Sequence, residues 1–487
     1  MDHIKELSAL IDARSKEFTE LSDRIWGFAE SRFQEFQSSK LDAAYLESQG
    51  FKVKLGVADE DTALVAEYGS GHPIIGFLGE YDALSGLSQQ ADVAEHCPIE
   101  AGCDGHGCGH NLLGTADLAA AVAIKEMMEQ GKLKGTVRFY GCPAEENAAG
   151  KAFMVRAGLF DDVDICLTWH PGWLNQVNGN GSLANIRVFY TFHGLSSHAA
   201  GAPHLGRSAL DAVELMDVGV NYMREHMIDE ARIHYAIINT GGTAPNVVQS
   251  EAQVLYAIRA PRVSQVMELF DRVSDCARGA ALMTQTKVDI RQVSACYDCI
   301  GNDVIAERFM KNMDALLPIE YTDEEIEYAR KFQEAITDLD KVSLKNAAKR
   351  IAGKDAAKLL EQPIWNFRVP GYVKSGGSTD VGNVSWVVPT AQFGMATLAA
   401  GTPGHAWQVV AQGKGSVAHK GMLAAAKVLA ATAYDFYTDE KLIEAAKEEL
   451  AQRLDGEQVP DALPKDLKPE FWYLFFSPRS LNRRKCL

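Results

Sequence analysis

Short apolar runs alternate with helical periodicity between about Phe51 and Pro171. This alternation is typical of an α/β unit, in which helices cover a largely parallel sheet. Long apolar helices are predicted from Leu112 to about residue 130 and from Ser416 to about residue 437, and an amphipathic helix from the N-terminus to about Glu30. Four apolar runs predict buried strands of this sheet, at residues 73–79, 136–142, 164–169 and 391–395.

The pattern changes near Ser182 and returns to the α/β type near Gly301. The intervening segment has long strand-like runs with alternating polarity and two helical stretches, which predict a compact α+β unit inserted into the α/β unit. Its strands are expected at 183–192, 234–239, 252–258 and 286–290, and its helices at 208–226 and 263–282. The predicted organisation is a discontinuous catalytic domain at 1–183 and 299–455, an inserted domain at 184–298 and a tail at 456–487.

Composition narrows the choice of partners and compartment. The chain has 487 residues and a net charge of −17, which disfavours nucleic acid or an anionic membrane as the main partner. No apolar run approaches the roughly 20 residues of a membrane span. The N-terminus lacks a signal-peptide pattern, and nine scattered cysteines fit a reducing compartment, so we expect a cytoplasmic protein in which Cys296 and Cys299 are free thiols.

Side chains able to bind metal follow the predicted strands. In open α/β sheets the ligand crevice lies outside the carboxyl ends of the strands, so these residues are expected to meet there. A soft sulfur ligand, several imidazoles and two adjacent carboxylates suit a two-metal hydrolase, because one carboxylate can hold metal while its neighbour handles protons. The candidates are Cys108, His110, Glu145, Glu146, His170 and His405.

A structural zinc cluster is the alternative explanation of the first of these motifs. Cys103, His106, Cys108 and His110 could supply four ligands. A closed structural site does not account for an acid pair at a strand end, and we therefore favour the catalytic interpretation.

Several motifs stand in the order found in the aminoacylase/carboxypeptidase-G metallopeptidases, and the chain most resembles the amidohydrolase branch of that family. The resemblance extends from the first helix to about Tyr437. It implies an α/β catalytic domain carrying a binuclear metal site, with an inserted α+β lid that mediates dimerisation. The motifs are Gly-Glu80-Tyr-Asp82-Ala-Leu, Gly-Cys108-Gly-His110-Asn-Leu, Cys-Pro-Ala-Glu145-Glu146, Ser-Ser-His198-Ala, Gly-Gly-Thr-Ala-Pro-Asn246-Val-Val, Gly-Gly-Ser378-Thr-Asp380-Val-Gly and Gly-Thr-Pro-Gly-His405.

The resemblance implies a role for each matching residue. Glu145 matches the catalytic base and Asp82 the acid that orients a ligand. Two positions depart from the pattern: Glu80 stands where other branches have His, and Asn111 where many members of this branch have Asp. The ions would be two divalent metals, zinc or manganese. Their implied ligands are Cys108, which would bridge them, and His110, Glu146, His170 and His405.

The implied reaction is hydrolysis of an N-acyl amino acid, with aminobenzoyl-glutamate as the expected substrate. A dipeptidase or general acyl-amino-acid hydrolase on the same site is the alternative, and a non-catalytic partner subunit is a third. Asn246, Arg259 and the backbone at Gly377-Ser378 would hold the substrate carboxylate, for which a planar guanidinium is well suited. His198 would reach the site from the lid of a dimer partner. The protein would be a homodimer, or a heteromer with a related A-type subunit.

Overall fold

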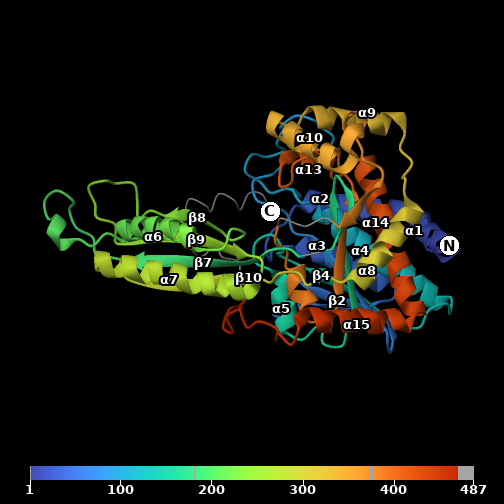
Figure 1. The fold of residues 1–487 in the computed structure, drawn as a ribbon, viewed down its shortest axis with the longest axis horizontal. Helices are drawn as coiled ribbons and strands as arrows, with labels where there is room; N and C mark the ends of the chain where they lie inside the picture. The colour runs from blue at the N-terminus through green and yellow to red at the C-terminus, as the bar shows by residue number, and fades with distance from the viewer. Residues whose placement is uncertain (1, 180, 373–376, 470–487) are drawn as a thin grey trace.

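The computed structural model describes residues 2–179, 181–372 and 377–469. These residues form a body built around an eight-stranded mixed sheet and an arm built around a four-stranded antiparallel sheet. Figure 1 shows the arm extending away from the body, with its strands and two helices running along its length. The predicted fold class, an α/β domain with an inserted α+β unit, is therefore confirmed.

The sheet of the body has the strand order β1-β2-β4-β3-β5-β12-β6-β11. The four predicted strands lie side by side in it: β3 pairs in parallel with β4 and β5, and β5 pairs in parallel with β12. Every residue of β3 and β4 is buried, which explains their continuous apolar sequence. The strands are β1 (Lys52–Leu55), β2 (Leu64–Ser70), β3 (Ile74–Glu80), β4 (Gly135–Cys142), β5 (Ile165–Gly172), β6 (Asn175–Asn178), β11 (Arg368–Tyr372) and β12 (Thr390–Ala396).

Helices cover both faces of this sheet. Ile75 and Phe77 of β3 pack in one apolar cluster, and Ile74 and Leu78 pack in another, because successive strand residues point to opposite faces. The first cluster is closed by α1 (Asp2–Ala13), α4 (His110–Glu129), α8 (Asp303–Leu316) and α14 (Ser416–Thr438), and the second by α5 (Gly150–Arg156) and α12 (Val381–Ser385). The remaining helices of the body include α2 (Ser15–Phe28), α3 (Phe36–Ser48), α13 (Trp407–Gln412) and α15 (Glu440–Leu454).

Two local features differ from the sequence-based expectation. The N-terminal helix is divided into α1 and α2 at Arg14, whose guanidinium donates to Glu17, Gln49 and Glu126 and so fixes the chain at a bend. β5 extends two residues beyond His170, so this histidine lies inside the strand rather than after it. The continued pairing of Met395 and Ala396 of β12 with Pro171 and Gly172 accounts for the extension.

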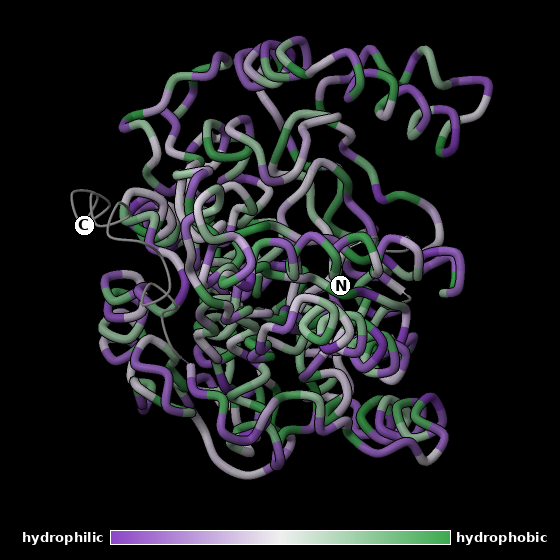
Figure 2. Tube along the Cα trace, turned by 90° about the vertical axis from the view of Figure 1, so that its left-hand side faces the viewer, coloured by the Kyte–Doolittle hydropathy of each residue, from purple (hydrophilic) through white to green (hydrophobic). Residues whose placement is uncertain are grey.

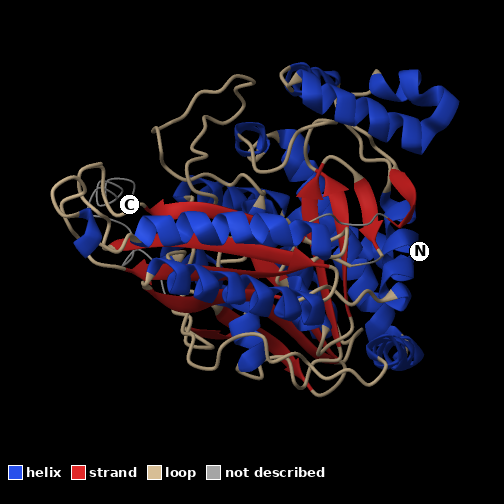
Figure 3. Ribbon diagram, turned by 60° about the vertical axis from the view of Figure 1, so that its left-hand side comes forward, coloured by secondary structure: helices blue, strands red, loops and turns tan. Residues whose placement is uncertain are grey.

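The inserted unit, hereafter the lid, has the strand order β10-β7-β9-β8. Two helices pack along the sheet, as Figure 3 shows, and their apolar residues form one core with the inward residues of β7 and β9. The expected strands and helices are all present. They are β7 (Ala184–His193), β8 (Arg232–Asn239), β9 (Glu251–Ala260), β10 (Lys287–Cys296), α6 (Ala209–Met223) and α7 (Val263–Thr284), with 3₁₀ turns at Pro203–Leu205 and Arg224–His226.

The charge-rich stretch from about Glu320 to Glu361 is helical, as predicted. It forms α9 (Asp323–Glu334), α10 (Asp338–Ala352) and α11 (Ala356–Leu360), with a 3₁₀ turn at Gly353–Asp355. These helices lie at the top of the molecule, where Figure 2 shows hydrophilic and hydrophobic segments alternating along them. Leu344 and Ala348 pack with Trp365 in a small separate core, which holds α10 on the body.

The segment after α15 packs against the lid and the body as far as it is described. Ala462, Leu463 and Leu467 join the core of the lid. The Gln292 amide donates to the Ala462 carbonyl at 2.6 Å, and Arg156 donates to the Leu467 carbonyl at 2.8 Å. Residues 470–487 of the expected tail lie outside the described part. None of the described helices is long and apolar enough to span a membrane.

Candidate functional site

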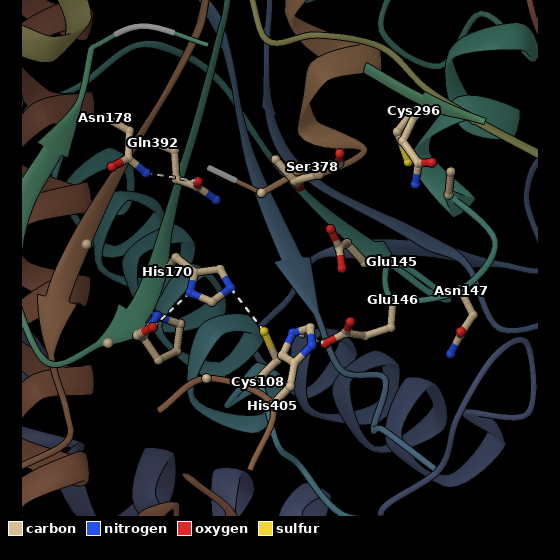
Figure 4. Close-up of a pocket in the computed structure, with 18 of the residues that line it drawn as sticks. Cys108, Glu145, Glu146, Asn147, His170, Asn178, Cys296, Ser378, Gln392 and His405 are labelled. Atoms are coloured by element: carbon tan, nitrogen blue, oxygen red, sulfur yellow. Dashed lines mark hydrogen bonds and ion pairs between the residues drawn. The ribbon is translucent and has the colours of Figure 1, made fainter. Parts of the chain in front are cut away.

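A cavity of about 440 Å³ lies where the lid meets the carboxyl ends of the central strands. Figure 4 shows its wall, with Cys108 between His170 and His405, Glu146 next to His405, and Glu145 above Glu146 towards Ser378. Apart from the adjacent acids, these residues come from segments of the body that lie far apart in the chain. The prediction that the strand ends bring scattered polar residues to one place is confirmed.

Two groups of potential metal ligands share the Cys108 sulfur. One group contains Cys108, His110 and His170, and the other contains Cys108, Glu146 and His405. Within each group the ligand atoms lie within 4.8 Å of one another. Cys108 Sγ is 3.3 Å from His170 Nε2, and His405 Nε2 is 3.5 Å from a Glu146 carboxylate oxygen. A thiolate that belongs to both groups can bind two ions at once. A structural site for one ion would need only one such group of ligands.

Asp82 connects the two groups. Its Oδ1 accepts from His110 Nδ1 at 2.7 Å, which turns His110 Nε2 towards the ligand groups, and its Oδ2 accepts from the Glu146 backbone N–H at 3.0 Å. Burial alone would raise the pKa of Asp82, but the adjacent His110 outweighs it and holds that pKa below its usual value. A charged Asp82 thus fixes both the ring of one potential ligand and the backbone of another.

The other two histidines are oriented by their own surroundings. His170 Nδ1 donates to the Pro171 carbonyl at 2.8 Å, which leaves Nε2 facing Cys108. His405 has φ of 53°, an unusual conformation for a residue other than glycine, and its N–H donates to the Gly107 carbonyl. This left-handed turn aims its exposed imidazole at Glu146.

Glu145 and Glu146 lie on a turn directly after β4. Ala144, just before them, has φ of 57°, and its N–H donates to the buried Glu35 carboxylate at 3.1 Å. Burial, together with the carboxylates of Glu80 and Glu146, raises the pKa of Glu145 well above its usual value. Burial also raises the pKa of Glu146, against the opposing effect of His110 and His405. A carboxyl group that holds its proton more tightly is a better proton carrier near neutral pH.

Glu80 is part of a buried ion network behind Glu145. The ammonium of Lys151 lies 2.5 Å from Glu80 and 2.7 Å from Asp380, and all three side chains are nearly inaccessible. The second Glu80 oxygen is 3.2 Å from His110 Nε2. Glu80, His110 and Glu145 form a further group of potential ligands, but the Lys151 ammonium already neutralises Glu80.

The donor set fits a pair of divalent cations. His110 Nε2 and a Glu146 oxygen are buried and make no hydrogen bond with the described residues; their nearest charged neighbours are the further candidate ligands Glu80, at 3.2 Å, and His405, at 3.5 Å. A buried imidazole nitrogen and a carboxylate oxygen, beside a thiol and further imidazoles, suit a borderline-soft metal such as zinc. The alternative structural cluster is not favoured, because His106 is bonded to the Ile25 carbonyl and belongs to none of the potential ligand groups found among the described residues.

Asn111 points away from the ligand groups. Its amide donates to Ser22 Oγ at 3.0 Å and to the Gly413 carbonyl at 3.1 Å. The side chain therefore ties the start of α4 to α2 and to the loop before α14. This packing role explains how the chain can depart from the family pattern here without altering the wall of the cavity.

The expected substrate-binding residues fall into two places. Arg259, Gly377 and Ser378 line the cavity, and Arg259 donates to Ser378 Oγ at 3.3 Å. His198 and Asn246 are not among the described residues that line it; they lie together elsewhere on the lid, where the Ala199 N–H donates to the Asn246 carbonyl at 3.0 Å. Within one chain the structure therefore brings together only part of the predicted substrate site.

Several residues that line the cavity were not anticipated from the sequence. Asn178 of β6 and Gln392 of β12 are hydrogen-bonded to each other at 3.3 Å above His170 (Figure 4). Arg187 of β7 also lines the cavity, and burial together with Arg187 lowers the pKa of Arg259. The sequence does single out Arg187, because it is the one charged residue between Ala184 and Phe192, where all the others are uncharged.

Comparison with known proteins places the chain in a family. The model of peptidase family M20/M25/M40 matches residues 76–464, which is most of the chain, so the chain belongs to that family of metal-dependent hydrolases. It is 46% identical over 466 residues to the B subunit of p-aminobenzoyl-glutamate hydrolase from Escherichia coli (strain K12), with 94% of this chain and 97% of that chain covered. The Xaa-Arg dipeptidase of Mus musculus is 28% identical over 464 residues, with 92% of each chain covered.

A solved structure gives the same fold. The YXEP protein of Bacillus subtilis, described as a dinuclear metal binding peptidase from the M20 family, superposes with a TM-score of 0.56 at 16% identity. The superposition covers 88% of this chain and 99% of that chain. The family predicted from the sequence is thus confirmed by the family model, and the superposition confirms the fold.

Proposed function

We propose that the protein hydrolyses the amide bond of p-aminobenzoyl-glutamate, releasing p-aminobenzoate and glutamate. One observation carries the proposal: two groups of metal ligands share Cys108 beside Glu145, in a cavity whose lid wall carries Arg187 and Arg259. The ligand groups beside Glu145 suit amide hydrolysis, and the arginine side chains of the lid wall suit an anionic substrate. The name of the Escherichia coli relative gives the acyl group.

In this proposal Cys108, which belongs to both ligand groups, would hold two divalent ions, zinc or manganese, together with His110, Glu146, His170 and His405. When bound, the ions would lower the pKa of water and polarise the amide carbonyl. Asp82 orients His110 and the Glu146 backbone through the two hydrogen bonds described above. The buried ligand atoms of His110 and Glu146, which make no hydrogen bond with the described residues, support this assignment.

Glu145 is the proposed base. Its carboxylate faces the cavity between the two ligand groups and Ser378 (Figure 4), so it can accept a proton from the attacking water and pass one to the leaving amine. Lys151 keeps the acids behind it from repelling one another.

The amino-acid half of the substrate would lie against Arg259, Ser378 and the Gly377 backbone. The guanidinium of Arg259 at this wall favours a substrate with carboxylates and disfavours an arginine side chain. This charge pattern separates the proposal from the alternative of a dipeptidase resembling the Xaa-Arg dipeptidase. Asn246 and His198 would complete the site of a second copy.

For the assembly we propose a homodimer through the lid, or a heteromer with an A-type subunit, because the Escherichia coli relative is named as one of the subunits of its hydrolase. We further propose a cytoplasmic location, because seven cysteines of the described part of the chain are free thiols.

The test is a substrate panel on protein stripped of metal and reloaded with zinc, manganese or cobalt. We expect kcat/KM for p-aminobenzoyl-glutamate to exceed that for p-aminobenzoyl-glutamine and for an N-acetyl amino acid, because the glutamate substrate brings the larger negative charge to the wall that carries Arg259. A dipeptide ending in arginine serves as the opposite-charge control. Preference for that dipeptide would assign the dipeptidase function, and no hydrolysis of any amide would assign a non-catalytic subunit.

A further inference from the structure

The near end of the lid sheet turns one face towards the catalytic residues. Arg187 of β7 pairs with Ala257 of β9 and Ser294 of β10, and Asn185 pairs with Arg259. Because alternate residues of a strand share a face, Arg187 and Arg259 are diagonal neighbours on one side of this sheet. Both line the cavity, together with Asn185, Ser294 and Cys296 of the same face.

Arg187 crosses from the lid to the turn that carries the acid pair. Its Nη1 donates to the Asn147 carbonyl at 3.0 Å and to Asn147 Oδ1 at 3.1 Å, and its Nη2 donates to the Glu146 carbonyl at 3.1 Å. One planar guanidinium thus holds three acceptors on two consecutive residues. A fork of fixed geometry constrains orientation as well as distance, which a single ammonium cannot do.

The body holds the same turn from the opposite side. Glu35 accepts from the Ala144 N–H and Asp82 accepts from the Glu146 N–H, so the amides of the turn are bound by the body and its carbonyls by the lid. Ala144 and Ala149, at the two ends of the turn, have φ of 57° and 61°. Backbone in this region is costly for alanine and persists only where surrounding contacts fix it.

We propose that Arg187 is a positioning residue through which the lid sets the place of Glu145. The inference rests on the proposed function, in which Glu145 is the base and Arg259 binds the substrate carboxylate. Since Arg187 and Arg259 belong to one sheet face, a substrate held by Arg259 and a turn held by Arg187 share one rigid support. The position of the lid over the substrate and the position of the base are therefore coupled.

The first test measures the turn itself and does not depend on turnover. In Arg187→Met, hydrogen–deuterium exchange of the peptide containing residues 143–150 should quicken clearly, while peptides of β4 and α4 keep their rates. Arg232→Met is the matched control, because Arg232 is a lid arginine that donates to nearby carbonyls of its own segment, those of Asp229 and Ala231. Unchanged exchange around the acid pair in Arg187→Met would overturn the proposal even in an inactive protein.

The second test separates positioning from substrate binding. We expect Arg187→Met to lower kcat about 10–100-fold, the range for a misplaced catalytic group, with KM within about twofold and both metals retained. Arg187→Lys keeps the charge but not the fork, so it should restore only a small part of kcat. Arg259→Met should instead raise KM. Normal kcat in either Arg187 variant, a raised KM alone, or loss of metal would contradict the assignment.

A double-mutant cycle with Asn147→Ala tests the contact directly. Asn147→Ala removes one of the three acceptors, so its effect on kcat should be smaller than that of Arg187→Met. In the Arg187→Met background the same substitution should have almost no further effect, because the two side chains act through one contact. Additive losses would show that Arg187 acts elsewhere. If wild-type protein hydrolyses no amide, the proposed function fails, while the exchange experiment still decides the role of Arg187.

Discussion

At the scale of single residues, replacement of Cys108 is predicted to reduce metal binding the most. It belongs to both ligand groups, whereas His170 belongs to one. We therefore expect Cys108→Ala to lose both ions and His170→Ala to retain part of the metal, as measured by elemental analysis after desalting. Cys276→Ala, a partly buried thiol of the lid, is the matched control and should retain all of it. Full metal content in Cys108→Ala would exclude a bridging thiolate.

Glu145→Gln should separate metal binding from proton transfer. The amide fills the same space but cannot carry the proton, and general acid–base groups contribute about 10²–10⁴-fold to rate. We expect metal content to stay at the wild-type value and kcat to fall within that range. Loss of metal would instead identify Glu145 as a ligand.

The buried carboxyl group of Asp42 should make the free energy of unfolding depend on pH. Burial raises its pKa from 3.8 to about 8, and neither carboxylate oxygen has a hydrogen-bond partner among the described residues. The folded protein thus keeps the proton that the unfolded chain releases above pH 3.8, so this group stabilises the fold less and less as pH rises from about 4 to about 8.

Asp42→Asn removes this titration. We expect the apparent unfolding midpoint in urea to rise at pH 8 and to change much less near pH 4, where the folded acid is neutral and the unfolded acid is only roughly half ionised. Asp59→Asn, at an exposed position, controls for the substitution itself. A gain of equal size at both pH values would show that ionisation of Asp42 is not the cause.

At the scale of elements, the close packing of α4 on β3 requires a glycine, Gly114, at the point of contact. A Cβ at Gly114 would lie 2.3 Å from the Glu80 carbonyl oxygen, so Gly114→Ala must push α4 away from the sheet. Overpacking of this kind costs about 1–3 kcal/mol, and here it would also displace His110 at the start of the same helix. We expect a lower unfolding midpoint together with weaker metal retention.

Gly27→Ala in α2 is the matched control for this prediction. Nothing lies within 4 Å of its added Cβ, and alanine is the better helix former by roughly 0.5–1 kcal/mol. The Gly27→Ala variant should leave metal binding unchanged and raise the unfolding midpoint slightly. Similar behaviour of the two variants would mean that α4 can shift without cost.

The sequence predicted elements best where burial is complete. β3 and β4 are buried on both faces, so their apolar runs were unambiguous, and the polar residues at their ends were correctly expected to converge. β6 is short and rich in Asn and Gln, and it exists because it pairs with β12 and β11. Its local sequence carries no strand signal, so Asn178 could not be placed in the cavity beforehand.

The Arg187 contact was missed for a similar reason. Nothing local in the sequence states that a lid strand meets the turn after β4, about 40 residues earlier in the chain. The partner of Lys151 was equally hidden, because Asp380 lies on a distant loop. Contacts between segments far apart in the chain are set by tertiary packing, which the polarity pattern describes only as buried or exposed.

At the scale of the whole molecule, the lid presents surfaces suited to a second copy. β8 forms one edge of the lid sheet, and an open edge can pair with another strand. Tyr235 and Ile237 on this strand are 40% and 41% exposed, and Tyr222 of α6 is 75% exposed. These apolar side chains support the proposed dimer through the lid, with the strand edge as part of its interface.

We expect His198 to act on the site of a partner, because it does not line the cavity of its own chain among the described residues. It is exposed, and its Nδ1 accepts from the Ala200 and Gly201 N–H groups at 3.2 and 3.0 Å. With Nδ1 accepting, the N–H of the ring is on Nε2. A donor of this kind can stabilise the oxyanion of an amide under attack, and loss of one such donor costs about 2.7–4 kcal/mol. Asn246 lies beside it and would enter the same partner site.

Subunit exchange between His198→Ala and Glu145→Gln tests action in trans. Each variant alone should be nearly inactive. A mixed dimer has one site lacking both groups and one site with both intact, so activity should return to about a quarter of wild type at random exchange between twofold-symmetric dimers. Mass spectrometry of isotope-labelled chains verifies the exchange. If exchange is complete and no activity returns, His198 serves the site of its own chain, and the pairing of lid and cavity across the dimer is wrong.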